Sequence, residues 1–137
     1  MTEQQATGRL LKRAQYRNHR AADRALATIG TSLAQWDALR AISESPDSSA
    51  HDLAITTFQS DQAFGTLANR LEAQGLIVRT SGRGRRVEHA LTVEGKRVFD
   101  AGLEVTKGVS QRAFEKLSLD EVNVLRELLD RVGEVPE

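Results

Sequence analysis

Four arginines lie within eight consecutive residues, with no acidic residue among them: Arg79, Arg83, Arg85 and Arg86. The sequence SGRG lies in the same stretch, and its two glycines are typical of the tight turn of a β-hairpin. A guanidinium group can bind a phosphate through two parallel hydrogen bonds or enter a narrow minor groove. The cluster therefore predicts contact with a polyanion, although a basic run of this kind also occurs as a solvated, charged turn.

Residues typical of catalysis or metal binding are few. The chain has no cysteine, and its three histidines, His19, His51 and His89, are not spaced as a ligand pair on one helix face. His89 alternates with apolar neighbours and is interpreted as a strand residue near the core. No glycine-rich loop ends in the Gly-Lys-Ser/Thr sequence that binds nucleotide phosphates. We therefore expect no catalytic residue, metal or cofactor, and a small enzyme is the least favoured function.

Length and composition predict one soluble globular domain. The chain has 137 residues, of which 39% are hydrophobic and 28% charged, and its formal net charge is zero. The charge is unevenly distributed, since residues 66–97 hold 7 basic and 3 acidic side chains and residues 98–137 hold 5 and 9. No apolar run approaches the roughly 18 residues of a membrane span, and the polar start lacks the apolar core of a signal peptide. We expect a cytoplasmic protein that contacts no membrane.

Two helices are predicted before residue 45. Apolar residues recur at helical spacing over residues 9–29, with basic residues on the opposite arc, so this helix is amphipathic. Ser32 followed three residues later by Gln35 predicts a capping box that starts a second helix, which ends near residue 44. The sequence SESPDSS then predicts a loop.

The middle of the chain has the pattern of a helix-turn-helix followed by a hairpin. Ser49 and Asp52 predict the cap of a short helix over AHDLAIT, and a second helix follows from about residue 61 to 74, closed by Gly75. Two short β-prone runs, LIVRT and RVEHALT, flank SGRG. Such a block places its second helix in the major groove of DNA and its hairpin tip near the backbone or the minor groove.

On the second helix of this motif, the outward side chains can meet base edges or phosphates. Glutamine and asparagine offer the paired donor and acceptor groups that suit adenine, and a glycine permits close approach. The alternative interpretation is an ordinary solvated helix face, with the arginine paired to an acid within the fold. The outward set consists of Gln62, Gly65, Thr66, Asn69 and Arg70.

Two further helices are predicted at the end of the chain. One begins at Thr92 and continues to about residue 117, and Ser118 with Glu121 predicts a capping box for the last. One small domain cannot cover the apolar faces of these long helices, so we expect a partner. The predicted fold is mainly α with a small β-hairpin, in a single domain. Its parts are residues 1–46 (N-terminal helices), 47–92 (winged helix-turn-helix DNA-binding lobe) and 93–137 (C-terminal dimerisation helices).

The chain resembles a MarR-family winged helix-turn-helix transcriptional regulator over nearly its whole length. The resemblance is carried by TSLAQWDALRAI, DLAITT and TLANRLEAQGLIVRTSGRGRRVEHALTVEG. It implies a homodimer with intertwined terminal helices, which presents two lobes to a palindromic operator in double-stranded DNA and acts as a repressor. It also implies DNA contacts from the recognition helix (Gln62, Gly65, Thr66, Asn69) and from the wing (Arg83, Arg85, Arg86).

Three positions depart from the family's pattern. Arg83 stands where the family often has an aspartate that braces the wing arginine, so we expect a more mobile and more cationic wing. Phe58 stands where the turn between the two helices usually has glycine, so a different turn geometry is expected. Thr66 replaces an arginine of many relatives on the recognition helix.

The resemblance further implies a small aromatic or phenolic acid as effector, bound between the dimer helices and the DNA-binding lobe. Tyr16, His19 and Trp36 lie in segments that could line that cleft, although Trp36 also suits the core and Tyr16 lies among charged positions. An effector would release the repressor by favouring a lobe spacing that does not match the operator half-sites. The alternative function is a winged helix that binds another protein and no DNA, because fold does not fix function.

Overall fold

The computed structural model of the chain describes all residues except 82, 83, 85 and 134–137. In this described part, helices and one hairpin follow in the order α1 (Glu3–Ala27), α2 (Leu33–Glu44), α3 (Ala50–Thr56), α4 (Asp61–Ala73), β1 (Ile77–Ser81), β2 (Val87–Leu91), α5 (Val93–Ala113) and α6 (Leu119–Arg131). The predicted fold class, mainly α with a small β-hairpin, is confirmed. None of the helices in the described ranges combines the length and apolarity that crossing a membrane requires.

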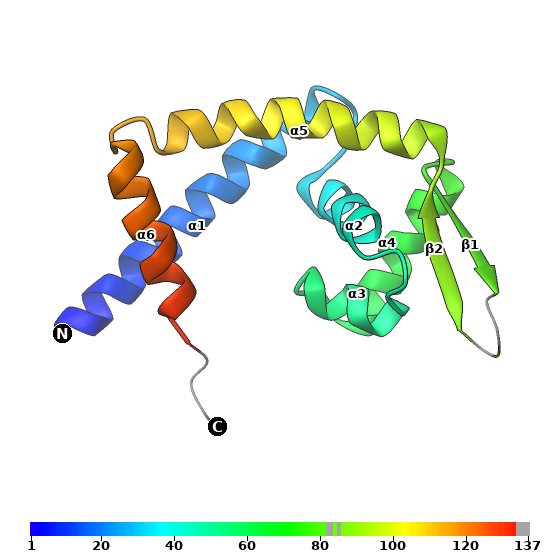
Figure 1. The fold of residues 1–137 in the computed structure, drawn as a ribbon, viewed down its shortest axis with the longest axis horizontal. Helices are drawn as coiled ribbons and strands as arrows, with labels where there is room; N and C mark the ends of the chain where they lie inside the picture. Colours follow the sequence, from blue (N-terminus) through cyan, green and yellow to red (C-terminus); the bar gives the residue numbers. More distant parts are fainter. Residues whose placement is uncertain (82–83, 85, 134–137) are drawn as a thin grey trace.

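The elements form a rounded lobe and an elongated arch (Figure 1). The lobe contains α2, α3, α4 and the hairpin, and α5 runs from the hairpin across the molecule toward α6. α1 packs along α5, and α2 also contacts α5. The arch consists of α1, α5 and α6, and the lobe is attached at one end of this arch.

Serine residues start most of the helices, as the sequence predicts. Ser49 and Ser118 form complete capping boxes with the third helical residue, whereas at Ser32 the box is incomplete. The Gln35 side chain accepts a hydrogen bond from the Thr31 hydroxyl at 3.3 Å instead of bonding back to the cap. The predicted start of this helix near residue 9 is wrong. A capping box between Thr2 and Gln5 starts α1 at Glu3.

The core of the lobe lies between α2, α3, α4 and the hairpin. Its largest buried side chains include Leu39, Ile42, Leu53, Phe64 and Leu71. β1 and β2 pair antiparallel with Ile77 opposite Leu91 and Ser81 opposite Val87. A two-stranded hairpin is marginally stable by itself, so its contacts with α4 and α2 hold it in place.

Two glycines let α5 approach the lobe closely. A methyl group at Gly95 would overlap the carbonyl oxygen of Leu76, and one at Gly102 would overlap the indole of Trp36. The Trp36 ring stacks on Phe99 with 5.9 Å between centroids, and its Nε1 donates a hydrogen bond to the Phe99 carbonyl at 3.1 Å. These contacts fix the orientation of the lobe relative to α5.

The far end of the arch is only loosely covered by its own chain. No residue of α6 is buried, and most of the N-terminal half of α1 is exposed. A groove of about 460 Å³ runs between α1 and α6 and is lined mainly by apolar side chains. Exposed apolar residues of this region are Leu10, Leu11, Phe114, Leu119, Val124, Leu128 and Leu129.

Candidate nucleic-acid interface

α4 buries one face in the lobe and exposes the other. Its N-terminus is capped by the Ser60 hydroxyl, which accepts a hydrogen bond from the Ala63 backbone at 3.0 Å. Phe64, Ala68 and Leu71 pack in the core. The polar positions predicted at sequence level therefore lie on the solvent side of this helix.

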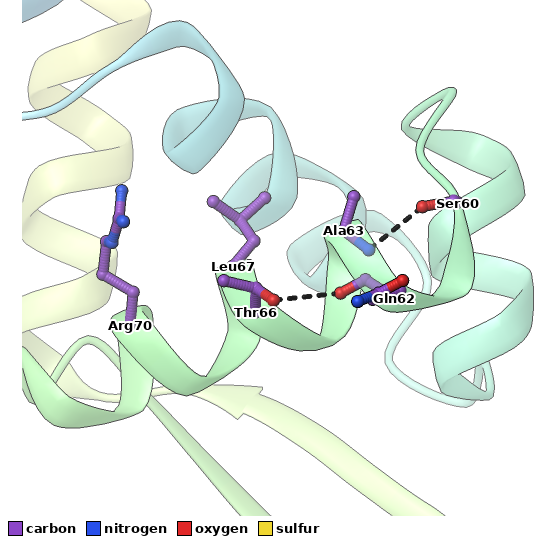
Figure 2. A pocket seen from close by; sticks show the side chains of 6 residues that line it. All are labelled: Ser60, Gln62, Ala63, Thr66, Leu67 and Arg70. Atoms are coloured by element: carbon purple, nitrogen blue, oxygen red, sulfur yellow. Dashed lines mark hydrogen bonds between the residues drawn. The ribbon is translucent and has the colours of Figure 1, made fainter.

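Figure 2 shows the side chains along the exposed side of α4, where an open groove of about 440 Å³ lies. Gln62, Thr66 and Arg70 line this groove. The Thr66 hydroxyl donates to the Gln62 carbonyl at 3.1 Å, so its proton is used within the helix. Within the described part of the chain, Arg70 forms no ion pair, so the alternative in which it pairs with an acid of the fold has no support there. A Cβ added at Gly65 would meet no atom of the described ranges within 4 Å, so packing against them does not require glycine there.

Arg79 lies in the middle of β1 and bonds to α4. Its guanidinium donates to the Glu72 carboxylate at 3.2 and 3.0 Å and to Asn69 Oδ1 at 2.7 Å. The hydrogen bond from Arg79 lowers the pKa of the Glu72 carboxyl, and the same contact raises the pKa of Arg79. An acid from the neighbouring helix therefore offsets the charge of Arg79, which sets it apart from the other arginines of this stretch.

The tip of the hairpin is described only in part. Gly84 has a φ of 76°, as the predicted glycine turn requires. The Arg86 side chain donates a hydrogen bond to the carbonyl oxygen of Asp47, in the loop between α2 and α3. Arg83 and Arg85 lie outside the described residues. The prediction that Arg83 leaves the wing without a bracing aspartate also falls on these residues and stays a prediction.

The turn between α3 and α4 keeps the backbone shape of a glycine turn. Phe58 has a φ of 58° and is 94% exposed. The Gln59 amide donates to the Ala54 carbonyl at 2.8 Å, which closes the turn. A phenylalanine in the left-handed region costs on the order of 1–2 kcal/mol. Phe58 thus takes the left-handed conformation that glycine adopts without strain. The expectation that the turn differs from that of relatives stays a prediction.

A hydrogen-bonded pair of His51 and Asp61 joins α3 and α4, the two helices of the helix-turn-helix motif. His51 Nδ1 lies 2.8 Å from Asp61 Oδ1, and about two thirds of each side chain is exposed. The hydrogen bond to Asp61, followed by its charge, raises the pKa of His51. Sequence reasoning missed this pair because its two members lie on different helices.

The structure separates the three predicted effector residues. Trp36 is buried against α5, whereas Tyr16 and His19 are exposed on α1. Tyr16 accepts a hydrogen bond from Arg20 at 3.2 Å. A cleft of about 380 Å³ lies elsewhere, between the end of α2, β2 and the start of α5, and none of the three is among its described lining residues. The effector role of the three residues stays a prediction.

His89 is the notable polar group at this cleft. Its side chain lies on β2, is only 4% exposed, and contacts the Phe64 ring at 6.0 Å between centroids. Among the residues that the structure describes, its Nδ1 finds no hydrogen-bond partner. Burial, followed by the charge of Arg79, lowers the pKa of His89, so the ring is neutral near pH 7. The interpretation of His89 as a strand residue near the core is confirmed, and the described residues contain no cluster of three metal-ligating side chains.

Comparisons with known proteins agree with this geometry. The model of the MarR family matches residues 29–86. The HTH-type transcriptional repressor Rv2887 of Mycobacterium tuberculosis is 26% identical over 111 residues, which cover 80% of each chain. A MarR-family regulator from Rhodococcus sp. RHA1 has a TM-score of 0.87 at 26% identity, over 96% of this chain and 95% of that one. Rv2887 in complex with salicylic acid has a TM-score of 0.76 at 26% identity, over 92% and 95%.

Proposed function

We propose that the chain is a MarR-family regulator: a homodimeric, sequence-specific DNA-binding repressor that a small-molecule effector releases. It works in the cytoplasm on a palindromic operator. The observation that carries this proposal is the exposed polar face of α4, held beside an arginine-rich hairpin. The relative Rv2887 is named as a repressor, which supports the same direction of control.

α4 has the dimensions and chemistry of a helix that enters the major groove. It has 13 residues, or about 20 Å at 1.5 Å per residue, and an α-helix fits that groove. Gln62 and Asn69 would contact base edges, and Thr66, Arg70 and the backbone at Gly65 would lie close to the same groove. The wing arginines, Arg83, Arg85 and Arg86, would contact phosphates or the minor groove.

A second copy of the chain is the partner that covers the apolar faces of α1 and α6. A helix that buries no residue in its own chain lacks the packing from which most helices in proteins gain stability. Leu128 and Leu129 of α6 are 49% and 43% exposed, and Leu129 lines the apolar groove to α1. Pairing of two such arches would bury these leucines and hold two α4 helices at a fixed separation.

The cleft beside His89 is the place in this chain that best suits an effector. Phe99 offers an aromatic ring, Lys96 a positive charge and His89 a neutral imidazole, and all three line the cleft. An aromatic acid matches these groups, and the relative Rv2887 has been crystallised with salicylic acid. A ligand here contacts both β2 and α5, so it would favour one lobe orientation over another.

A salt titration of DNA affinity tests the proposal against the protein-binding alternative. Fluorescence anisotropy of labelled duplexes should show log affinity falling linearly with log salt, because phosphate contacts release counterions. Duplexes selected from a random pool should contain an inverted repeat, with half-sites about one helical turn or a multiple of it apart. Flat salt dependence and no selected repeat would favour a winged helix that binds another protein.

A further inference from the structure

The contact between Arg79 and Asn69 restricts what the recognition helix can read. Arg79 Nη2 donates to Asn69 Oδ1 at 2.7 Å, and the two bonds to Glu72 fix the guanidinium at the same time. The Arg79 side chain is 26% exposed and that of Glu72 is 43% exposed. Arg79 is therefore held between two residues of α4 rather than pointing into solvent.

The chemistry of the two groups fixes the orientation of the Asn69 amide. A guanidinium has only donors, so the group that faces it must be the carbonyl oxygen of Asn69. The NH₂ group lies on the other side of the amide carbon and is left for an outside partner. Asn69 itself is exposed, with Thr66 and Arg70 beside it on α4. The side chain thus offers donors outward, while its oxygen is oriented toward Arg79.

Recognition of adenine by asparagine needs both halves of the amide. The oxygen accepts from N6 and the NH₂ donates to N7. Because the bond from Arg79 holds the Asn69 oxygen toward β1, the amide meets a base mainly through its NH₂ donors, which suits base acceptors such as guanine N7 and O6, adenine N7 or thymine O4. Adenine then loses its advantage over guanine at this position.

We propose that Arg79 is a specificity-determining positioning residue, which orients the Asn69 amide so that α4 reads a hydrogen-bond acceptor in the major groove at one base pair of each half-site. The inference rests on the proposed function, because it needs α4 to lie in that groove. The Glu72 carboxylate keeps Arg79 in place, and Arg79 also pairs across the hairpin with His89. A residue of β1 thereby sets which DNA base the recognition helix α4 prefers.

The experiment compares duplexes selected from a random pool by the full-length dimer and its variants. Asn69→Ala identifies the base pair that Asn69 contacts. At that pair, a 7-deazapurine that lacks the N7 acceptor, or an equivalent acceptor deletion, should weaken wild-type binding about fivefold, the value of one hydrogen bond. Arg79→Ala frees the amide to rotate, so preference at this pair should shift toward adenine by about fivefold or more.

Arg97→Ala is the matched control, because Arg97 also forms an ion pair, with Glu94 at 2.9 Å, but lies on α5 and is 72% exposed. It removes the same charge and should leave base preference unchanged. In the Asn69→Ala background, Arg79→Ala should cause no further change of preference. Glu72→Gln retains Arg79 and loosens its position, so it should shift the preference in the same direction and by less.

An equal loss of affinity for all duplexes in Arg79→Ala, with unchanged base preference, would overturn the inference. The same holds if Glu72→Gln and Arg79→Ala both remain folded by circular dichroism and select the wild-type sequence. Failure of the wild-type dimer to select any duplex would instead refute the proposed function. The two failures are therefore distinguishable in one set of selections.

Discussion

The close packing of α5 on α2 can be tested with a single methyl group. Gly102 lies opposite Trp36, and a Cβ there would overlap the indole Nε1 and Cδ1 atoms. The indole is buried, stacked on Phe99 and hydrogen-bonded to the Phe99 carbonyl. Gly102→Ala must therefore displace a side chain that packing holds on two sides.

The expected magnitude follows from opposing contributions. Alanine is favoured over glycine in a helix interior by about 1 kcal/mol. Against this gain stand overpacking strain of about 1–3 kcal/mol and the loss of the indole hydrogen bond, worth about 1 kcal/mol. We expect Gly102→Ala to lower the free energy of unfolding by about 1–3 kcal/mol.

Gly108→Ala is the matched control, since Gly108 lies on the same helix and a Cβ there would meet no atom of the described residues within 4 Å. This variant should gain about 1 kcal/mol. Urea unfolding followed by circular dichroism, at one protein concentration, compares the two. Trp36 is the only tryptophan, and its emission should shift to longer wavelength in Gly102→Ala alone. Equal stability with unchanged emission would refute the packing described for α5.

Three further perturbations test the dimer, the wing and the His51–Asp61 pair. Leu128→Asp should raise the dimer dissociation constant roughly thirtyfold or more, as an unpaired buried carboxylate costs about 2 kcal/mol or more; unchanged sedimentation at low concentration contradicts the dimer surface. Arg85→Ala should weaken binding to all duplexes and lower the salt slope by about one unit per lobe; an unchanged slope excludes Arg85 from the phosphate contacts. The folded pKa of His51 is raised, so its stabilising contact with Asp61 is complete below the unfolded pKa near 6.5 and is lost as pH rises through the folded value. Thermal midpoints of wild type and His51→Gln should therefore converge as pH rises, and a constant gap would contradict the pair.

Local signals explain why the order of elements was predictable. The Ser49 and Ser118 caps involve residues three positions apart, so the sequence displays both partners together. α3 has the predicted bounds, and α4 ends one residue before the predicted limit, where Gly75 takes a φ of 74°. The start of α1 was missed because its cap lies in a polar stretch where apolar periodicity, the stronger signal, has not begun.

Contacts between elements set the parts of the site that the sequence could not predict. Arg79 lies seven residues from Glu72 and ten from Asn69, across a turn and onto another element, so no helical or strand period connects them. Trp36 and Phe99 are 63 residues apart, which is why Trp36 remained open between core and effector cleft. Residue type therefore indicated a candidate interface, whereas tertiary pairing decided which side chains of that surface are already bonded within the chain.

The pairing of Arg79 with Glu72 changes the number of phosphates that the wing can neutralise. The sequence offers four arginines, which at about 0.9 per phosphate would contribute roughly 3.6 units of salt slope per lobe. Glu72 offsets the charge of Arg79, whereas the Asp47 carbonyl that Arg86 contacts carries no charge to offset. Without Arg79, the other three arginines of the sequence would contribute at most roughly 2.7 units. Glu72→Gln should restore part of the difference, because it leaves Arg79 uncompensated beside the DNA. A steeper salt dependence in that variant, with Arg97→Ala unchanged, is thus the electrostatic counterpart of the change in base preference.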